Sequence, residues 1–181
     1  MHEDLTRVLL TREQLDEKIK QLGRRISEDY TGKNLLMISV LKGSVIFMAD
    51  LMRAISIPAR IDFMAVSSYG HGTKSAGSVK ILKDLDISLY DYDLLVVEDI
   101  LDSGVTLSSL LTILKSRGPK SIRLCTLLDK PERRMVAIKP DYVGFEVPDE
   151  FVVGFGLDYD EKYRNLPYIG ILKPEIYTEK Q

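Results

Sequence analysis

The sequence has few of the features that mark secreted, disulfide-bonded or membrane-spanning proteins. It contains a single cysteine, Cys125, among 181 residues, so no disulfide framework can form within the chain. No apolar run approaches the roughly 18 residues of a membrane helix. The N-terminal Met1-His2-Glu3-Asp4 is acidic where a secretory signal would be basic and then apolar. We therefore expect a cytoplasmic protein without a membrane segment.

An excess of charge of one sign is also missing. The chain has 25 lysines and arginines against 27 aspartates and glutamates, a formal net charge of −2, and the two signs are mixed along the sequence. The electrostatic footprint of a nucleic-acid-binding protein is therefore absent, and we expect no nucleic-acid partner.

Tandem repeats, low-complexity tracts and a Pro/Ser-rich linker are absent as well, and a single domain over residues 1–181 is the expectation for this length. Thr11-Arg12-Glu13-Gln14 has the form of a capping box and predicts a helix to about Asp29. A second helix is expected to open at Gly43. The predicted strands are 34–41, 61–66, 79–82, 94–97, 122–128 and 142–145, with 169–172 as a late edge strand. Strands that alternate with helices favour an α/β fold with a mainly parallel sheet. Cys125 falls within one of these strands, which predicts a buried, inert thiol.

The most informative stretch is residues 94–106. Its continuous apolar start suits a strand that is covered on both faces, and Glu98 and Asp99 follow at the strand's carboxyl end, where open α/β sheets bind their ligands. Leucines at helical spacing place a helix start near Val105 or Thr106. The turn before that helix offers backbone N–H groups and hydroxyls, which together form an anion site. The stretch therefore predicts a site for a sugar phosphate.

These residues carry a resemblance to a known family. Hydrophobic residues, Glu-Asp, two more hydrophobic residues and Asp-Ser-Gly-Val-Thr resemble the phosphoribosyl pyrophosphate (PRPP) signature of type I phosphoribosyltransferases. Further motifs are similar to the hypoxanthine-guanine phosphoribosyltransferases, over about Leu35 to Leu172: Leu41-Lys42-Gly43, Ser68-Tyr69, Lys130 and the segment 139–164 (KPDYVGFEVPDEFVVGFGLDYDEKYR). The resemblance implies a mainly parallel central sheet flanked by helices (core about 30–145). It also implies a small hood from the terminal segments and a lid loop at about 67–78.

The resemblance also implies an activity. Members of this family act in purine salvage: they transfer 5-phosphoribose from PRPP to hypoxanthine or guanine, use Mg²⁺, and give IMP or GMP plus pyrophosphate. They usually form homodimers or homotetramers. The same assembly is expected here.

Family roles carry over to particular positions. The PRPP- and phosphate-binding positions are Lys42, Gly43, Glu98, Asp99, Asp102, Ser103, Gly104, Val105, Thr106 and Arg164. The acidic pair is expected to hold the ribose hydroxyls, directly or through Mg²⁺, and the metal positions are Glu98, Asp99 and Asp158. Many members carry Lys where this chain has Val105, which matters little if backbone N–H groups hold the phosphate.

The purine-binding positions are Lys130, Phe151, Val152 and Asp158. The ammonium of Lys130 is expected at the purine O-6, which favours an oxo group over the amino group of adenine. Phe151 would stack on the purine ring, and Val152 would offer its backbone to the purine edge. Asp102 would be the general base that accepts the proton from purine N-7, and Ser68 and Tyr69 would begin a lid that excludes water.

Plainer interpretations stay open at this point. Asp102 can be only the N-cap of the helix, Lys42-Gly43 only a turn, Lys130 a surface lysine and Phe151 ordinary core. Two other functions also remain: a regulator that senses PRPP and binds nucleic acid, and a transferase that prefers xanthine. A regulator would show a basic face and would lack the base-binding residues, and neither property is seen in this sequence.

Overall fold

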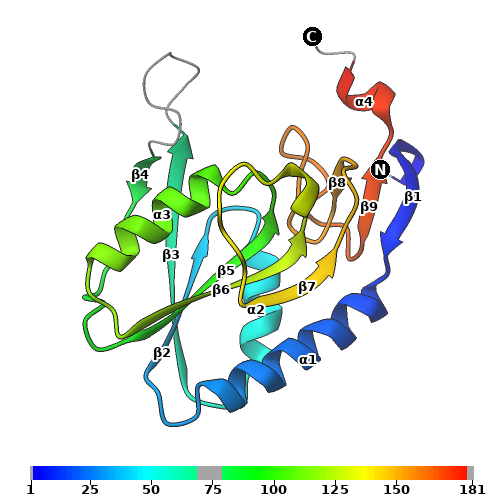
Figure 1. The fold of residues 1–181 in the computed structure, drawn as a ribbon. Coiled ribbons are helices and arrows are strands. Elements are labelled where there is room, and N and C mark those ends of the chain that lie inside the picture. Colours follow the sequence, from blue (N-terminus) through cyan, green and yellow to red (C-terminus); the bar gives the residue numbers. More distant parts are fainter. Residues whose placement is uncertain (1, 69–78, 179–181) are drawn as a thin grey trace.

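The computed structural model describes residues 2–68 and 79–178, which form a six-stranded sheet and a three-stranded sheet with helices around them (Figure 1). The six-stranded sheet contains, in spatial order, β4 (Val79–Lys83), β3 (Ala59–Ser68), β2 (Leu35–Val40), β5 (Asp93–Leu101), β6 (Ser121–Asp129) and β7 (Tyr142–Glu146). The small sheet contains β1 (Leu5–Leu10), β9 (Ile169–Leu172) and β8 (Val152–Val153). The helices are α1 (Arg12–Asp29), α2 (Val45–Ala54), α3 (Val105–Ser116) and α4 (Pro174–Thr178), and 3-10 turns occupy His2–Asp4 and Pro131–Arg133. None of the described helices is long and apolar enough to cross a membrane.

The large sheet is mainly parallel. Strand β2 runs parallel to both β3 and β5, and β5, β6 and β7 are parallel to one another, whereas β4 is antiparallel to β3. The predicted α/β fold with a mainly parallel central sheet is confirmed. The order of strands along the chain reverses between β2 and β5, and α/β sheets of this kind bind ligands at the carboxyl ends of such a strand pair.

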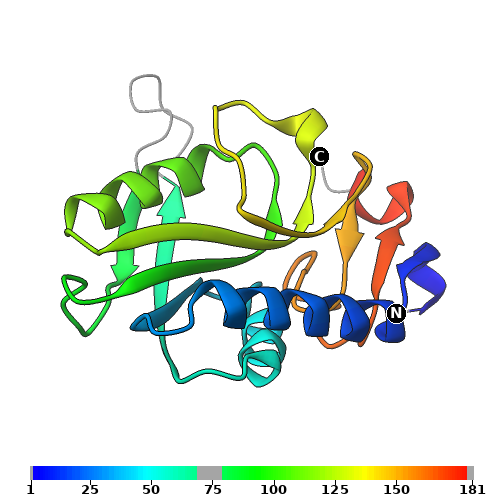
Figure 2. The ribbon, with the colours of Figure 1, turned by 60° about the horizontal axis from the view of Figure 1, so that its bottom comes forward.

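Helices cover both faces of the large sheet. Figure 2 shows α1 and α2 on one face and α3 on the other. Side chains alternate along β5 accordingly: Leu95 and Val97 join the core beneath α1 and α2, and Leu94 and Val96 join the core beneath α3. This alternation explains why the strand is apolar at every position from Leu94 to Val97.

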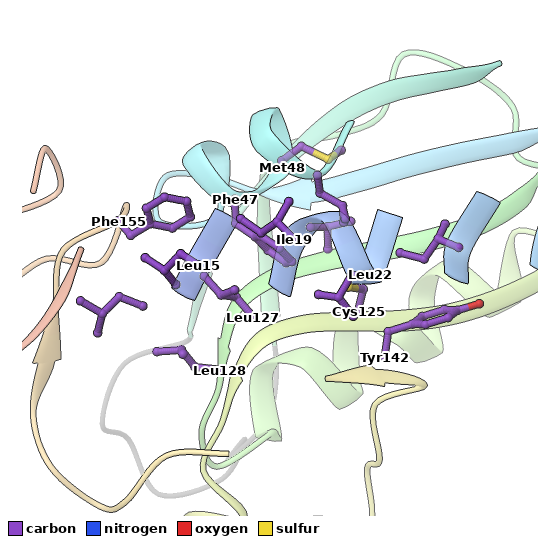
Figure 3. Packing of buried hydrophobic residues seen from close by; sticks show 14 of the residues in the cluster. Leu15, Ile19, Leu22, Phe47, Met48, Cys125, Leu127, Leu128, Tyr142 and Phe155 are labelled. Carbon is purple, nitrogen blue, oxygen red and sulfur yellow. The ribbon is translucent and has the colours of Figure 1, made fainter. Parts of the chain in front are cut away.

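The core beneath α1 is densely filled (Figure 3). Leu15, Ile19 and Leu22 of α1 pack with Phe47 of α2 and with the sheet. Helix α1 begins as predicted, because Thr11 and Gln14 form the reciprocal capping box. Cys125 is fully buried in this core, and burial raises the pKa of its thiol, which fits the predicted inert cysteine.

The small sheet differs from the prediction. Strand β9 was expected at a sheet edge, but it lies in the middle, antiparallel to β1 on one side and to β8 on the other. Strands β1 and β8 are absent from the strands predicted above, so that prediction gives β9 no neighbour on either side. All four β9 residues are buried, as a central strand requires.

Several element boundaries also differ. Strand β5 continues through Glu98 and Asp99 to Leu101, whereas the expected strand ends at Val97. The helix expected to open at Gly43 begins at Val45, because Ser44 takes the N-cap position. Strand β3 continues to Ser68, which pairs with Val79 of β4, so the segment expected as a loop from residue 67 starts later. The rest of the predicted lid, including Tyr69, lies outside the described residues.

Candidate active site

The predicted site residues converge at the carboxyl edge of the large sheet, around two adjoining pockets. The first, of about 430 Å³, is bordered by Lys130, Phe151, Val152 and Asp158. The second, of about 220 Å³, is bordered by Glu98, Ser103, Gly104 and Thr106. Ile100 and Asp102 border both pockets. Asp102 therefore lies where a ligand in one pocket would meet a ligand in the other.

The second pocket is formed by the turn between β5 and α3. Gly104 is the N-cap of α3 with φ of 79°, and a Cβ at this position would lie 2.6 Å from Cγ2 of Ile138. A side chain is thus excluded both by the left-handed backbone and by the contact. The N-cap is Gly104 and no side chain caps this helix, so the interpretation of Asp102 as a mere N-cap is wrong. Ser103, Gly104 and Thr106 border the pocket, so the N-terminus of α3 lies beside it, and helix N-termini of this kind typically attract anions.

Glu98 and Asp99, near the carboxyl end of β5, face different parts of the site. Glu98 borders the second pocket, whereas Asp99 faces the loop after β2, where a Cβ on Gly43 would lie 1.9 Å from Oδ2 of Asp99. Burial raises the pKa of Glu98 well above its usual value, helped by the charge of Asp99. Burial also raises the pKa of Asp99 to about 6. Both carboxyl groups therefore sit in an environment that favours a nearby positive charge.

The loop after β2 reaches the segment that contains Arg164. Nζ of Lys42 lies 3.2 Å from Oε2 of Glu161, and Nη2 of Arg164 lies 3.5 Å from Oε1 of the same residue. Arg164 also forms an ion pair of 2.9 Å with Asp158. The Leu41–Lys42 peptide bond is cis. Ion pairs thus bring Lys42, Asp158 and Arg164 together. Glu161, which links Lys42 to Arg164, was missed because an acid in so polar a segment gives no separate signal.

The first pocket contains a buried lysine. The Lys130 side chain is only 7% exposed, and its Nζ donates a hydrogen bond of 2.6 Å to the carbonyl oxygen of Glu150. Burial lowers the pKa of this ammonium. The surface-lysine interpretation is therefore wrong.

Phe151 borders the same pocket and keeps 36% of its surface exposed, so it is not ordinary core. Val152 follows it on β8, paired with Ile171 of β9. Six residues that were not predicted from the sequence also border this pocket: Ile100, Arg133, Asp149, Glu150, Leu157 and Tyr177. Arg133 follows Lys130 by three residues, which is a weak signal, and Tyr177 is far from every motif.

The carboxylates predicted to bind Mg²⁺ are Glu98, Asp99 and Asp158. Among the described residues no group of three His, Cys, Asp or Glu side chains is arranged to hold a metal ion. Glu98 instead lies at the second pocket, and Asp99 and Asp158 lie near each other. Burial, and to a smaller extent the charge of Asp158, raises the pKa of Asp99. Mg²⁺ typically binds through one or two carboxylates plus substrate phosphates and keeps several waters, so this donor set fits a cation that arrives with a polyphosphate.

Comparison with known proteins identifies the family. A model described as "Phosphoribosyl transferase domain" matches residues 9–160. The hypoxanthine-guanine phosphoribosyltransferase of Bacillus subtilis is 54% identical, with 98% of each chain covered. The chain belongs to the hypoxanthine-guanine phosphoribosyltransferase family. The resemblance noted in the sequence is confirmed.

Solved structures of this phosphoribosyltransferase family agree. A hypoxanthine phosphoribosyltransferase from Staphylococcus aureus is 53% identical and superposes with a TM-score of 0.95, over 98% of this chain and 97% of that one. The hypoxanthine phosphoribosyl transferase of Trypanosoma cruzi has 42% identity and a TM-score of 0.94, over 99% and 97% of the two chains. The bifunctional protein TilS/HprT of Listeria innocua is 58% identical over 99% of this chain, but the chain spans only 28% of its length.

Proposed function

We propose that this phosphoribosyltransferase transfers 5-phosphoribose from PRPP to hypoxanthine or guanine, giving IMP or GMP plus pyrophosphate, as a single domain over residues 1–181. The observation that carries the proposal is the place of Asp102 on the border of two pockets. One of them contains a buried ammonium and the other the N-terminus of α3. A purine in the first and a sugar phosphate in the second would meet at this carboxylate.

The first pocket supports a 6-oxopurine. The Lys130 ammonium is a fixed donor that would pair with the O-6 oxygen, and it cannot accept a hydrogen bond from the amino group of adenine. The ring of Phe151 would stack on the purine, and the backbone of Val152 and the nearby Asp158 would face the purine edge. A site that binds an oxo group in this way rejects the amino analogue, because the N–H of Lys130 directed at the base would be left without an acceptor.

The second pocket supports the phosphoribosyl group. The 5-phosphate would accept hydrogen bonds from the backbone N–H groups of residues 103–106, so Val105 needs no side-chain contact. The hydroxyls of Ser103 and Thr106 would add donors, and Glu98 and Asp99 would hold the ribose hydroxyls. The pyrophosphate would lie beside the Lys42-Gly43 backbone and the guanidinium of Arg164, whose planar donors suit a polyanion.

In the reaction, purine N-9 bonds to the sugar C-1 while the bond from C-1 to the pyrophosphate oxygen breaks, with inversion at C-1. The proton on N-7 passes to Asp102 Oδ. Mg²⁺ bound to PRPP and held by Glu98, Asp99 and Asp158 would neutralise charge on the departing pyrophosphate. The protein's own contribution is positioning of the two substrates and donors directed at the leaving group. Tyr69 and the residues after it, which follow Ser68 at the end of β3 and lie outside the described part of the chain, would close over the site as a lid and exclude water.

The proposal is tested by pyrophosphate release from PRPP and Mg²⁺ with hypoxanthine, guanine, xanthine or adenine, for the wild type and Asp102→Asn. We expect turnover with the first two bases, little with adenine, and a loss of about 10²-fold to 10⁴-fold in kcat for the variant, the usual contribution of a general base. Xanthine as the preferred base would replace hypoxanthine and guanine in the proposal. Tight PRPP binding without turnover by the wild type would instead support the regulator.

We also propose a homodimer or homotetramer that works in the cytoplasm. Helix α2 supports an assembly, because Val45, Ile46 and Met52 keep 36%, 38% and 36% of their surfaces exposed. Light scattering after size exclusion would test it, and a monomer at micromolar concentration would contradict it.

A further inference from the structure

The C-terminal helix contributes an aromatic ring to the first pocket. Tyr177 of α4 stacks on Phe151, with 4.9 Å between ring centroids and 24° between the ring planes. Tyr177 also borders the first pocket, together with Phe151 and Lys130. Figures 1 and 2 both place α4 next to the small sheet that contains β8. The last described helix thus lies beside the proposed purine pocket.

A second ring contacts Phe151 from another direction. Tyr159 meets it edge-on, with centroids 5.6 Å apart and an angle of 89° between the planes, and Tyr159 and Tyr177 contact each other at 6.5 Å. Rotation of a phenylalanine ring about χ2 has a broad energy profile, so a half-exposed ring is not oriented by its own backbone. One parallel and one perpendicular neighbour fix its plane, since both geometries are favourable for aromatic pairs.

Tyr177 itself is firmly anchored. Ile176 and Tyr177 pack against the buried cluster that contains Leu5, Val153 and Leu172. The amide of Leu172 donates to the carbonyl oxygen of Phe151 at 2.8 Å, and the amide of Lys173 donates to the carbonyl oxygen of Asp4 at 2.9 Å. The backbone at Phe151 is therefore hydrogen-bonded to the end of β9, which leads directly into α4 and Tyr177. These bonds hold the two stacked rings in place.

We propose that Tyr177 is a positioning residue for base binding: its ring fixes the plane of Phe151 against which the purine stacks. The proposal rests on the proposed function, because it presumes a purine in the first pocket. Tyr177 borders the first pocket and not the second, where the phosphate turn lies, and its ring contacts are with Phe151 and Tyr159 rather than with Asp102. Loss of Tyr177 should therefore act on the KM of the base and leave the KM of PRPP and kcat nearly unchanged.

The experiment compares Tyr177→Ala, Tyr177→Leu and Tyr177→Phe with a matched control, Tyr90→Ala. Tyr90 is 73% exposed and lies shortly before β5, at the opposite end of the sheet. We expect Tyr177→Ala to raise the KM of hypoxanthine about threefold to tenfold, the effect of losing one aromatic pair. Tyr177→Leu should fall between Ala and wild type, because it fills space without a ring, and Tyr177→Phe should restore the wild-type KM. Tyr90→Ala should change nothing.

Several outcomes would overturn the inference. These are an unchanged base KM in Tyr177→Ala, an equal rise for PRPP and base, or a Tyr177→Phe variant as impaired as Tyr177→Ala. Size exclusion and thermal unfolding of each variant separate an effect on the pocket from an effect on assembly or folding, and Tyr177→Leu and Tyr177→Phe decide the matter if Tyr177→Ala does not fold. A wild type that turns over no base overturns the proposed function as well, whereas normal wild-type turnover with an unaltered Tyr177→Ala overturns only this inference.

Discussion

Nε of Arg133 lies 3.0 Å from Oδ1 of Asp102, the carboxylate shared by the two pockets. The same guanidinium contacts Oδ1 of Asp149 at 3.2 Å through Nη1. Asp102, Arg133 and Asp149 all border the first pocket. A purine that approaches Asp102 therefore meets a carboxylate with one oxygen already beside a guanidinium.

We expect Arg133→Gln to lower the KM of hypoxanthine, because the base no longer competes with this ion pair. Exposed pairs of this kind stabilise by about 0.2–1 kcal/mol, which corresponds to at most about a fivefold change. Arg133→Lys, which keeps the charge, is the control and should stay close to the wild type. Steady-state kinetics with saturating PRPP gives the answer, and a raised KM in Arg133→Gln would mean that Arg133 assists binding.

The turn before α3 gives a second prediction. Gly104→Ala should destabilise the protein by about 1–3 kcal/mol and raise the KM of PRPP, because both the positive φ and the contact with Ile138 oppose a side chain. Gly32→Ala is a matched control, since Gly32 has φ of 77° with nothing within 4 Å of its Cβ position. Gly32→Ala therefore measures the cost of the backbone strain alone, whereas Gly104→Ala also includes the steric contact with Ile138. Urea unfolding and PRPP kinetics should show the smaller loss of stability in Gly32→Ala and a changed KM only in Gly104→Ala.

Lys130→Met should remove discrimination between oxo and amino purines. A hydrogen bond to a charged group contributes about 1.5–3 kcal/mol, so kcat/KM for hypoxanthine should fall about tenfold to 150-fold while the low activity with adenine stays the same or rises. Lys115→Met on the exposed face of α3 is the control. An equal loss with both bases would show that Lys130 supports the pocket structurally without reading O-6.

The pH dependence of stability should show the contribution of Asp29. Its Oδ2 accepts hydrogen bonds from Tyr142 Oη at 2.6 Å and from Arg123 Nη1 at 2.9 Å, and these contacts hold the pKa of the carboxyl below its usual value. The folded pKa is thus lower than the unfolded one. The stabilisation is therefore complete above the unfolded pKa of about 3.9 and is lost as the pH falls through the folded pKa.

Asp29→Asn should accordingly be less stable than the wild type at pH 7, by about 1 kcal/mol or less for so exposed a pair. The difference should shrink below about pH 4, near the reference pKa of aspartate. Asp91→Asn, at an exposed position, is the control and should track the wild type throughout. Unfolding free energies between pH 3 and pH 7 would test this, and a difference that grows at low pH would contradict it.

Local patterns were sufficient to predict much of the fold and the phosphate site. The helix at Thr11 follows from its capping box, and the strand before Glu98 follows from an apolar run that both faces of the sheet require. Strands β1 and β8 were missed because their pattern is short and their partner is far away in sequence. Register between such segments is set by tertiary packing, which one sequence does not display.

Three of the missed site residues share the same cause. Each contacts a residue that is distant in the sequence. Glu161 contacts Lys42, 119 positions away, Arg133 contacts Asp102, 31 positions away, and Tyr177 contacts Phe151, 26 positions away. Each belongs to a residue type that is ordinary in its local segment. Only the arrangement of the loops around the pocket shows what they contact.

The stacking wall of the proposed base pocket and the proposed sugar-phosphate pocket are built on different sheets. The acidic pair lies in β5 of the large sheet and the phosphate turn follows this strand, whereas Phe151 and Val152 are held by the small sheet and α4. Substitutions in β8, β9 and α4 can therefore change the wall that meets the base without disturbing the strands that hold the sugar phosphate. This separation gives evolution, or a protein engineer, a way to alter the accepted base while the donor and its chemistry stay the same.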